Sequence, residues 1–416
     1  MSNRWFFHKI WLILATLLLA ACNSQSEPQS PNKQPEPLQG QILLWEEMPP
    51  GLTKAQSSKQ QKVSKDIVEK FTKLYPRVKV FVEFFPPEQI WEPFELQVKR
   101  GAGPDLLAAY SSPKIRPLIQ TGALRALDHS EVDQSQFRPE ALKEVRYRGK
   151  LYGLPLFLST QVLCYNKDIV KELPRTLPEL IEQARRGYSV GLDSGFAETF
   201  WAIGIFGGQL FDDRGRVVLA EGGGWVKSMK WLKKVQNEPT FILSDDAQAL
   251  QQALVEGKLA YLTCASGWIP HLKEALGKDK LGATLLPGEA NQPATPWLWA
   301  GFFLFNRASS PNQNRLALKL AQFLTNVEQQ KQIEAEVPFI PANKNVTIDR
   351  RLFPLRAALL DQSRTAVTVS FDYAEKFELI EDYGEILYQR VLAGEIAPDE
   401  AATQLTQTVN RQFGGE

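Results

Sequence analysis

The amino-acid sequence predicts an α/β protein of two lobes joined by crossover strands. The chain has 416 residues, too many for one ordinary hydrophobic core, so we expect two domains of roughly 150–200 residues each. Strand and helix patterns alternate over residues 41–110, as is typical of a parallel sheet. Residues 151–158 and 161–165 are extended segments in direct succession. Because no helix separates them, they predict one long strand that leaves one sheet and enters another.

The first lobe is predicted from short strands and amphipathic helices. A strand is expected over residues 41–45, and Glu46–Gly51, which contains two prolines, is expected to end it. Residues 59–75 predict a helix because their apolar side chains fall on one helical face. The other elements expected here are a strand over 78–85, a helix over 91–100 and a strand over 106–110.

The rest of the chain is predicted to alternate in the same way after the polar turn Arg148–Lys150. A strand is expected over residues 259–264, and a return crossover over 297–306, where Gly301 interrupts an apolar strand. Helices are expected over residues 178–186, 225–235, 246–256, 314–335 (with a break near Thr325), 350–362, 373–393 and 397–413.

The N-terminus has the pattern of a cleaved secretory signal over residues 1–21. A basic segment precedes an apolar run over 10–21, which is too short to span a bilayer but fits a signal-peptide core. Leu19–Cys22 resembles a bacterial lipobox, which implies cleavage before Cys22 and lipidation of its thiol; an ordinary secretory signal with a coincidental cysteine is the alternative. Residues 22–37 predict a polar, disordered tether. We therefore expect the protein on the periplasmic side of the cell envelope, anchored to the membrane through the lipidated Cys22.

Three sequence blocks resemble those of a known family. At 101–105 the chain reads Gly-Ala-Gly-Pro-Asp, and over 149–168 Gly-Lys-Leu-Tyr-Gly-Leu-Pro leads into Leu-Cys-Tyr-Asn-Lys-Asp. In the third block, residues 257–268, a Gly-Lys pair after a helix precedes Gly-Trp. Together they resemble the extracellular solute-binding proteins of ABC importers, family 1, the maltose-binding-protein-like class. Tyr261 departs from the third block, in which a methionine is usual.

This resemblance implies a two-lobed periplasmic-binding-protein fold of type II, in which each lobe is a central sheet flanked by helices. Lobe 1 would comprise residues 38–155 and 301–345, and lobe 2 residues 160–297 and 350–416, with hinges near 154–160 and 297–301. The resemblance further implies a lipid-anchored monomer that captures a small solute between the lobes and delivers it to an ABC permease.

The residues themselves do not indicate an enzyme. His129 and His271 are the histidines that follow the leader, and neither has a second metal ligand at helical spacing. There is no nucleophile elbow, P-loop or dinucleotide-binding glycine pattern. Glu46 and Glu47 are adjacent on an extended chain, so their side chains point opposite ways. A net charge of +1 gives no electrostatic reason to expect nucleic-acid binding. We expect a non-enzymatic protein without a metal or cofactor.

Tryptophans near the expected strand ends favour a carbohydrate ligand. Sugars offer CH faces that stack on aromatic rings and hydroxyls that carboxylates and amides bind. Trp268 is the strongest candidate because it follows directly after a strand, although filling the core is the ordinary role of a tryptophan. Glu46 is a candidate hydroxyl acceptor, with a place in a surface loop as its equal alternative. The full set of expected ligand contacts is Trp268, Glu46, Trp299, Trp45, Tyr110, Ser111, Gln161, Trp201 and Phe371.

Two alternatives to a sugar-binding importer component stay open. One is a binding protein for another small solute, such as a polyamine or an amino acid derivative. Pro49 and Pro50 stand where sugar binders of the family commonly have a more polar loop, so they leave the identity of the ligand open. The other is a lipoprotein whose cleft serves sensing or interaction without transport.

Two cysteines follow Cys22, and the sequence leaves their state open. Cys164 and Cys264 both lie in strand-like segments. They are equally compatible with buried free thiols and with a disulfide, because the sequence does not give the distance between their Cα atoms.

Overall fold

The computed structural model describes residues 37–49, 54–277, 279–289, 291–336 and 339–414. The expected signal peptide, Cys22 and nearly all of the expected tether lie outside the described residues. Within these ranges, no helix is long and apolar enough to cross a membrane.

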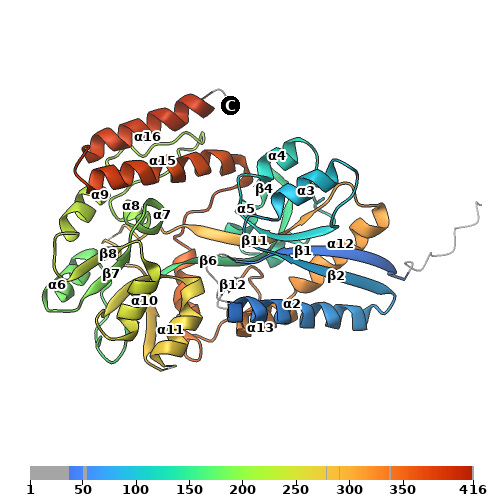
Figure 1. The fold of residues 1–416 in the computed structure, drawn as a ribbon, viewed down its shortest axis with the longest axis horizontal. Coiled ribbons are helices and arrows are strands. Elements are labelled where there is room, and N and C mark those ends of the chain that lie inside the picture. Colours follow the sequence, from blue (N-terminus) through green and yellow to red (C-terminus); the bar gives the residue numbers. More distant parts are fainter. Residues whose placement is uncertain (1–36, 50–53, 278, 290, 337–338, 415–416) are drawn as a thin grey trace, which may run out of the picture. The chain divides into compact units, whose positions relative to one another are not determined.

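A mixed sheet of ten strands organises the described chain (Figure 1). Its strands follow the order β2-β1-β3-β11-β6-β9-β7-β8, and β10 and β12 also pair with β6. β1 pairs in parallel with β2 and β3, and β7 pairs in parallel with β8 and β9, whereas the pairs that involve β6 or β11 are antiparallel. The bounds are β1 Gly40–Glu47, β2 Val78–Phe85, β3 Leu106–Tyr110, β6 Gly153–Asn166, β7 Val190–Asp193, β8 Phe241–Ser244, β9 Tyr261–Ala265, β10 Leu281–Thr284, β11 Leu298–Phe305 and β12 Ile340–Pro341.

The central strand β6 confirms the prediction of one long crossover strand. Its N-terminal part pairs with β11, from Leu304 opposite Gly153 to Leu298 opposite Thr160. Its C-terminal part, from Gln161 onwards, pairs instead with β9 and β10. Gly301 of β11 allows the strands to come close, because a Cβ atom there would lie 2.3 Å from the Phe157 ring. One strand therefore belongs to both halves of the sheet. The first half contains β2, β1, β3 and β11, and the second half contains β9, β7, β8 and β10.

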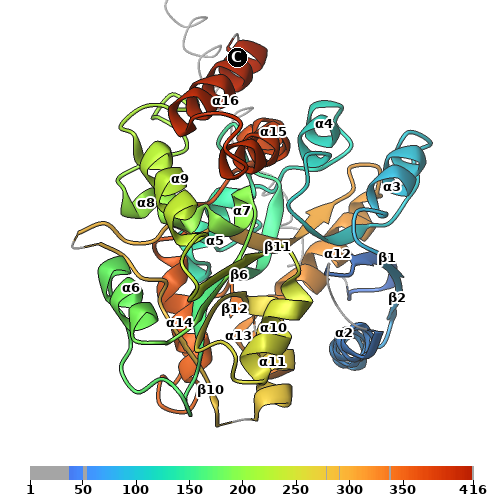
Figure 2. The ribbon, with the colours of Figure 1, turned by 60° about the vertical axis from the view of Figure 1, so that its left-hand side comes forward.

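Helices flank both halves of the sheet (Figures 1 and 2). Helix α2 lies beside β2, and α15, α16 and α9 lie against one another. The helices longer than six residues are α2 Lys54–Leu74, α3 Trp91–Val98, α6 Leu177–Arg185, α9 Gly224–Val235, α10 Ala247–Val255, α11 Ile269–Leu276, α12 Pro311–Leu324, α13 Val327–Glu336, α14 Pro354–Ser363, α15 Ala374–Leu392 and α16 Pro398–Phe413. The shorter ones are α4 Ile115–Gln120, α5 Pro139–Glu144, α7 Phe196–Thr199 and α8 Trp201–Ile205. The α/β class predicted from the sequence is confirmed.

Several element boundaries differ from the prediction; helix α2, for example, begins at Lys54 and not at residue 59. Strand β1 does not end at Trp45 but continues through Glu46 and Glu47, which pair with Phe84 and Phe85 of β2. The prolines interrupt pairing only from Pro49 onwards, so the two glutamates keep their ladder hydrogen bonds. Helix α14 begins at Pro354 and not at residue 350, because proline is favoured in the first turn of a helix.

The second half of the sheet has a core rich in aromatic side chains. Trp201 and Trp231 meet edge to face with ring centroids 5.7 Å apart, and Trp297 stacks on Phe200 at 3.7 Å. Trp201 and Trp297 are at most 1% exposed. The first contact joins α8 to α9, and the second joins the residue before α8 to the residue before β11.

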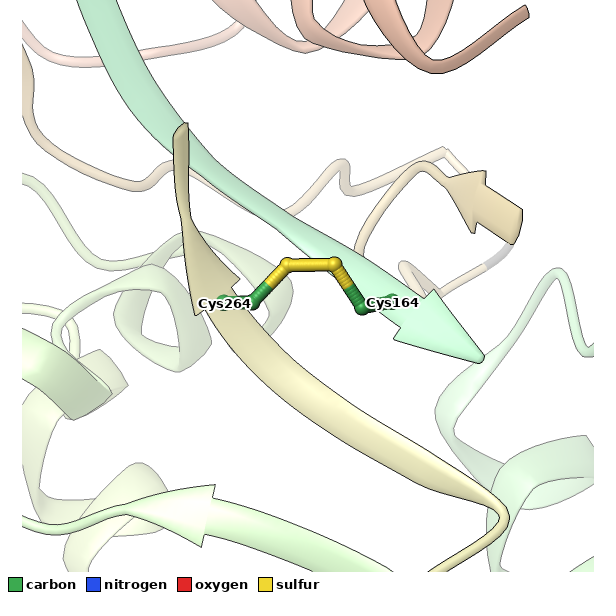
Figure 3. Close-up of a disulfide and its surroundings, with 2 residues drawn as sticks. All are labelled: Cys164 and Cys264. Carbon is green, nitrogen blue, oxygen red and sulfur yellow. A yellow bond between two sulfur atoms is a disulfide. The ribbon is translucent and has the colours of Figure 1, made fainter. Parts of the chain in front are cut away.

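A disulfide joins strands β6 and β9 (Figure 3). Cys164 and Cys264 have Cα atoms 5.9 Å apart and are separated by 100 residues in sequence. Both side chains are fully buried. Of the two states that the sequence left open, the structure shows the disulfide.

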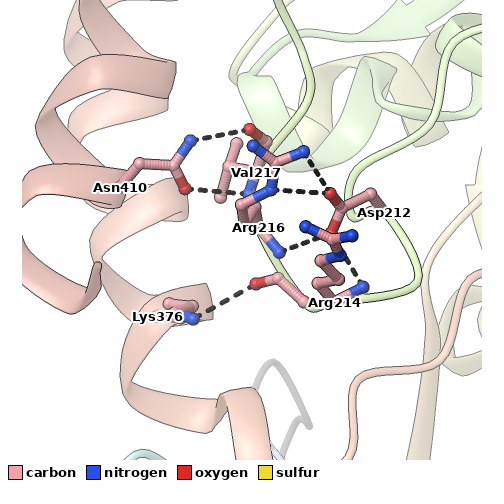
Figure 4. A network of polar contacts seen from close by, with 7 residues as sticks. Asp212, Arg214, Arg216, Val217, Lys376 and Asn410 are labelled. Carbon is pink, nitrogen blue, oxygen red and sulfur yellow. Dashed lines mark hydrogen bonds and ion pairs between the residues drawn. The ribbon is translucent and has the colours of Figure 1, made fainter. Parts of the chain in front are cut away.

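A polar turn at residues 212–217 contacts the C-terminal helices α15 and α16 (Figure 4). Asp212 Oδ1 accepts hydrogen bonds from the backbone N–H groups of Arg214 and Arg216. Asn410 of α16 bonds both backbone groups of Val217, accepting from N at 3.0 Å and donating to O at 2.9 Å. Lys376 of α15 donates to the carbonyl of Gly215 at 3.1 Å. Side chains of α15 and α16 therefore hold the turn through hydrogen bonds to its main chain.

Candidate functional site

A cavity of about 370 Å³ opens where β2 and β3 end. We call it the larger cavity, because it is the larger of the two cavities that predicted site residues line. The segments that follow the carboxyl ends of parallel strands are where α/β sheets place ligands. The opposite wall comes from the first residues of β11 and from α15. The lining residues are Glu88, Ser111, Ser112, Pro113, Lys114, Glu144, Trp297, Leu298, Trp299, Val369, Phe371, Ala374, Phe377, Glu378 and Glu381.

Glu47 fixes the two loops that border this cavity. It is 6% exposed, and its carboxylate accepts hydrogen bonds from Glu88 N at 2.6 Å and from Tyr110 N at 3.1 Å. Burial raises the pKa of Glu47 to about 6, against the opposing effect of these two hydrogen bonds. Glu88 has a φ of +61°, which a side-chain-bearing residue rarely adopts. Such backbone strain is typical of binding loops held by their surroundings.

Glu144 is the most deeply buried carboxyl group of the cavity. Only 1% of it is exposed. Its Oε2 accepts from Ser111 Oγ at 3.1 Å and from Ala300 N at 2.8 Å, which joins α5, the loop after β3 and strand β11. Its Oε1 has no hydrogen-bond partner within the described chain. Burial raises the pKa of Glu144 to about 8.

Helix α15 contributes a second group of carboxylates. Glu378 and Glu381 line the cavity, and burial, followed by repulsion from Glu198, raises the pKa of Glu381 to about 8. Burial, followed by repulsion from Glu198 and Asp245, raises the pKa of Asp193 to about 7. Asp193 ends strand β7. Glu198 therefore interacts electrostatically both with Glu381 of the cavity and with Asp193 at the end of β7.

Aromatic rings complete the cavity walls. Trp299 is half-buried and Phe371 is 2% exposed. Phe371 meets Phe302 edge to face at 5.2 Å, and Trp297 meets Phe377 in the same way at 4.6 Å. The cavity thus combines ring surfaces with carboxyl groups, which is the combination that binds polar organic solutes.

Glu46 and Tyr110 line a smaller cavity beneath α2, of about 70 Å³. Because side chains alternate along a strand, Glu46 points to the face opposite Glu47. Its carboxyl group accepts a hydrogen bond from Ser64 Oγ of α2, and burial raises its pKa to about 7. The Tyr110 ring lies 5.6 Å from the ring of Phe157.

The predicted site residues therefore fall into three groups. Trp299, Ser111 and Phe371 meet at the larger cavity, and Glu46 and Tyr110 line the smaller one. The other four lie elsewhere. Trp45 is 3% exposed and packs on Phe85, and Trp201 is buried in the core. Gln161 is buried, and its Nε2 donates a hydrogen bond to the carbonyl of Glu198. Trp268 is half-buried and lies just after β9.

Sequence reasoning missed several cavity residues, above all Glu144 and the α15 glutamates. Glu144 directly precedes the Val145–Lys150 stretch that leads into the crossover strand, which is a positional signal that could have found it. Glu378 and Glu381 are spaced three residues apart and share a helix face, yet a charged face on a helix is ordinarily solvated. Among the described residues, no group of three or more His, Cys, Asp or Glu side chains could hold a metal ion.

One curated relative matches nearly the whole chain, and another matches about three quarters of it. A galactooligosaccharide-binding protein of Bacillus subtilis (strain 168) is 27% identical, over 96% of this chain and 94% of its own. A maltotriose-binding protein of Pyrococcus abyssi is 25% identical, over 74% of this chain and 68% of its own.

Solved structures share the fold. A cyclo/maltodextrin-binding protein complexed with maltotetraose superposes with a TM-score of 0.77 at 22% identity, and covers 91% of this chain and 99% of its own. The maltose/maltodextrin-binding domain MalE from Bdellovibrio bacteriovorus, bound to maltotriose, has a TM-score of 0.71 at 21% identity, over 90% of this chain and 100% of its own. The pattern of the family described as "Bacterial extracellular solute-binding protein" matches residues 66–349. The chain belongs to this family of bacterial extracellular solute-binding proteins.

Proposed function

We propose that the protein captures an oligosaccharide in the larger cavity and delivers it to an ABC importer. The observation that carries this proposal is the half-buried Trp299 in one cavity with the buried carboxyl group of Glu144. A ring stacks on the apolar face of a sugar while carboxyl oxygens bind its hydroxyls. The relatives' names, galactooligosaccharide-binding and maltotriose-binding protein, support the same ligand class.

Binding measurements with a matched pair of variants test this proposal. Galactooligosaccharides, maltotriose and maltotetraose are titrated into the whole protein by calorimetry. Trp299→Ala is expected to weaken binding about tenfold to hundredfold, because it removes the stacking surface. Phe353→Ala, which changes an exposed aromatic outside both cavities, is expected to leave affinity unchanged. Absence of binding by every saccharide would overturn the proposal.

Membrane anchoring through Cys22 is part of the same proposal. Its support is the Leu19–Cys22 sequence, which resembles a lipobox. A lipid anchor would keep the binding protein beside the permease at the periplasmic side of the envelope. Cys22→Ser is expected to release the protein from the membrane fraction of the native host and to abolish incorporation of labelled fatty acid. Unchanged labelling of the variant would contradict the anchor.

A further inference from the structure

The larger cavity has more carboxyl groups than a neutral sugar needs. Glu88, Glu144, Glu378 and Glu381 line it, and Lys114 is the one cation among its described lining residues. Hydroxyl groups can be bound by neutral donors and acceptors as well as by carboxylates. Glu144 is buried and Glu381 is half-buried, so their charged forms are costly until a cation lies beside them. The excess therefore points to a ligand with positive charge.

Glu144 gives an independent indication of what is bound. It is 1% exposed, and one of its oxygens already accepts from Ser111 Oγ and Ala300 N. The other oxygen, Oε1, is buried and has no partner within the described chain. An unsatisfied buried carboxyl oxygen is costly, so Oε1 is suited to bind a hydrogen-bond donor of the ligand.

The aromatic lining is compatible with the same ligand chemistry. Trp299 and Phe377 line the cavity together with Glu378 and Glu381. The faces of aromatic rings attract cations as well as the apolar faces of sugars. Rings and carboxylates in one wall can thus receive a saccharide ring and a charged nitrogen side by side.

We propose that this cavity binds an amino-substituted oligosaccharide, whose protonated amine lies between Glu144 and Glu381. The inference rests on the proposed function, because it specifies the class of saccharide. Other charged groups also act on these two carboxylates: Lys143 on Glu144, and Glu198, Asp382 and Glu378 on Glu381. The three acidic neighbours of Glu381 add to the attraction for a cation.

A matched ligand pair separates amine recognition from sugar recognition. Chitotriose, a glucosamine trimer, and its triacetyl derivative share one skeleton, but acetylation removes the positive charges. Both are titrated into the whole protein by calorimetry, together with maltotriose and with spermidine, a cation without a sugar ring. Chitotriose is expected to bind at least about tenfold more tightly than triacetylchitotriose, because a charge-assisted hydrogen bond replaces a neutral one.

Three glutamine variants locate the effect within the protein. Glu144→Gln and Glu381→Gln are each expected to remove most of the preference for chitotriose. Glu140→Gln makes the same charge change one turn earlier in α5, at a residue that does not line the cavity, and is expected to keep the preference. Glu381 makes no hydrogen bond or ion pair within the described chain, so Glu381→Gln tests the inference even where Glu144→Gln fails to fold.

The outcomes separate this inference from the proposed function. Equal or tighter binding of the neutral saccharides overturns the inference and leaves the proposed function intact. A preference for chitotriose that Glu144→Gln and Glu381→Gln both retain also overturns the inference. Binding of spermidine with no binding of any saccharide overturns the proposed function, and with it the amino-oligosaccharide, while the cation site remains supported.

Discussion

At the residue scale, Glu46 and Glu47 show how strand geometry gives two neighbours different roles. Glu47 is buried, and its carboxylate accepts hydrogen bonds from the backbone N–H groups of Glu88 and Tyr110. Glu46 faces α2 and bonds Ser64. Sequence reasoning selected Glu46 as a hydroxyl acceptor, whereas Glu47 is the residue that supports the cavity loops.

Replacing Glu47 by glutamine is expected to lower the free energy of unfolding by about 1–3 kcal/mol, because the N–H group of Glu88 or of Tyr110 then faces an amide NH₂ group. Urea denaturation measures this change, and calorimetry with the bound saccharide should show weaker binding as the loops loosen. Glu46→Gln is the matched control on the same strand and is expected to cost less, because an amide oxygen can still accept from Ser64. Equal stability of Glu47→Gln and the wild type would contradict the role assigned to Glu47.

Burial of Glu144 predicts a specific pH dependence of stability. Its pKa is raised from 4.5 to about 8, so the folded state binds the proton more tightly than the unfolded state does. The stabilisation by this proton is fully present below about pH 4.5 and is lost as the pH rises to about 8. Thermal unfolding across this range should therefore show a smaller fall in Tm for Glu144→Gln than for the wild type. Parallel curves for the two proteins would show that Glu144 does not titrate in this window.

At the scale of elements, the disulfide joins the crossover strand to the strand that leads into Trp268. Cys164 lies in β6, and Cys264 in β9, just ahead of Ser266–Trp268. Ser266 Oγ also lies 2.5 Å from Ser159 Oγ of β6. The position of Trp268 therefore depends on the pairing of β6 with β9.

Replacing both cysteines by serine is expected to lower the free energy of unfolding by about 2–5 kcal/mol, because a crosslink that closes a loop of this length restricts the unfolded chain strongly. Denaturation of the oxidised wild type, the reduced wild type and the double variant measures the effect. The reduced wild type and the double variant should agree, since both lack the crosslink. A double variant as stable as the oxidised wild type would contradict a stabilising disulfide.

At the scale of the whole molecule, β6 and β11 run between the two halves of the sheet. The larger cavity is lined by loops after β2 and β3, by the start of β11 and by α15, so a ligand there contacts segments distant in sequence. We propose that lobe 1 (residues 38–155 and 301–345) and lobe 2 (160–297 and 350–416) close on the ligand about hinges near 154–160 and 297–301. A ligand that contacts both lobes stabilises the closed form by its differential affinity.

Small-angle scattering tests closure in solution. The radius of gyration is expected to decrease when a saccharide confirmed by calorimetry is added at saturation. Trp299→Ala at the same saccharide concentration is the control, because weaker binding should leave more of the protein open. Identical profiles with and without a bound ligand would contradict domain closure.

Much of the architecture could be predicted from the sequence because it depends on local patterns of apolar and polar residues. The helix over Trp225 to Val235 and the long crossover strand follow from apolar periodicity and from the absence of a helix between two extended segments. The family match confirms the expectation of a binding protein that is not an enzyme. The site was predicted less completely: Trp299, Ser111 and Phe371 line the larger cavity, but Glu144, Glu378 and Glu381 were not foreseen.

By itself, the sequence determined the α/β class, the shared crossover strand and the family, because periodicity and short motifs depend on residues close together in the chain. Only the tertiary structure decided which side chains meet. Trp201 fills the core while Trp299 lines the cavity, Cys164 pairs with Cys264, and Glu144 meets Ser111 and Ala300. These outcomes depend on burial and on contacts between distant segments, which local patterns do not encode.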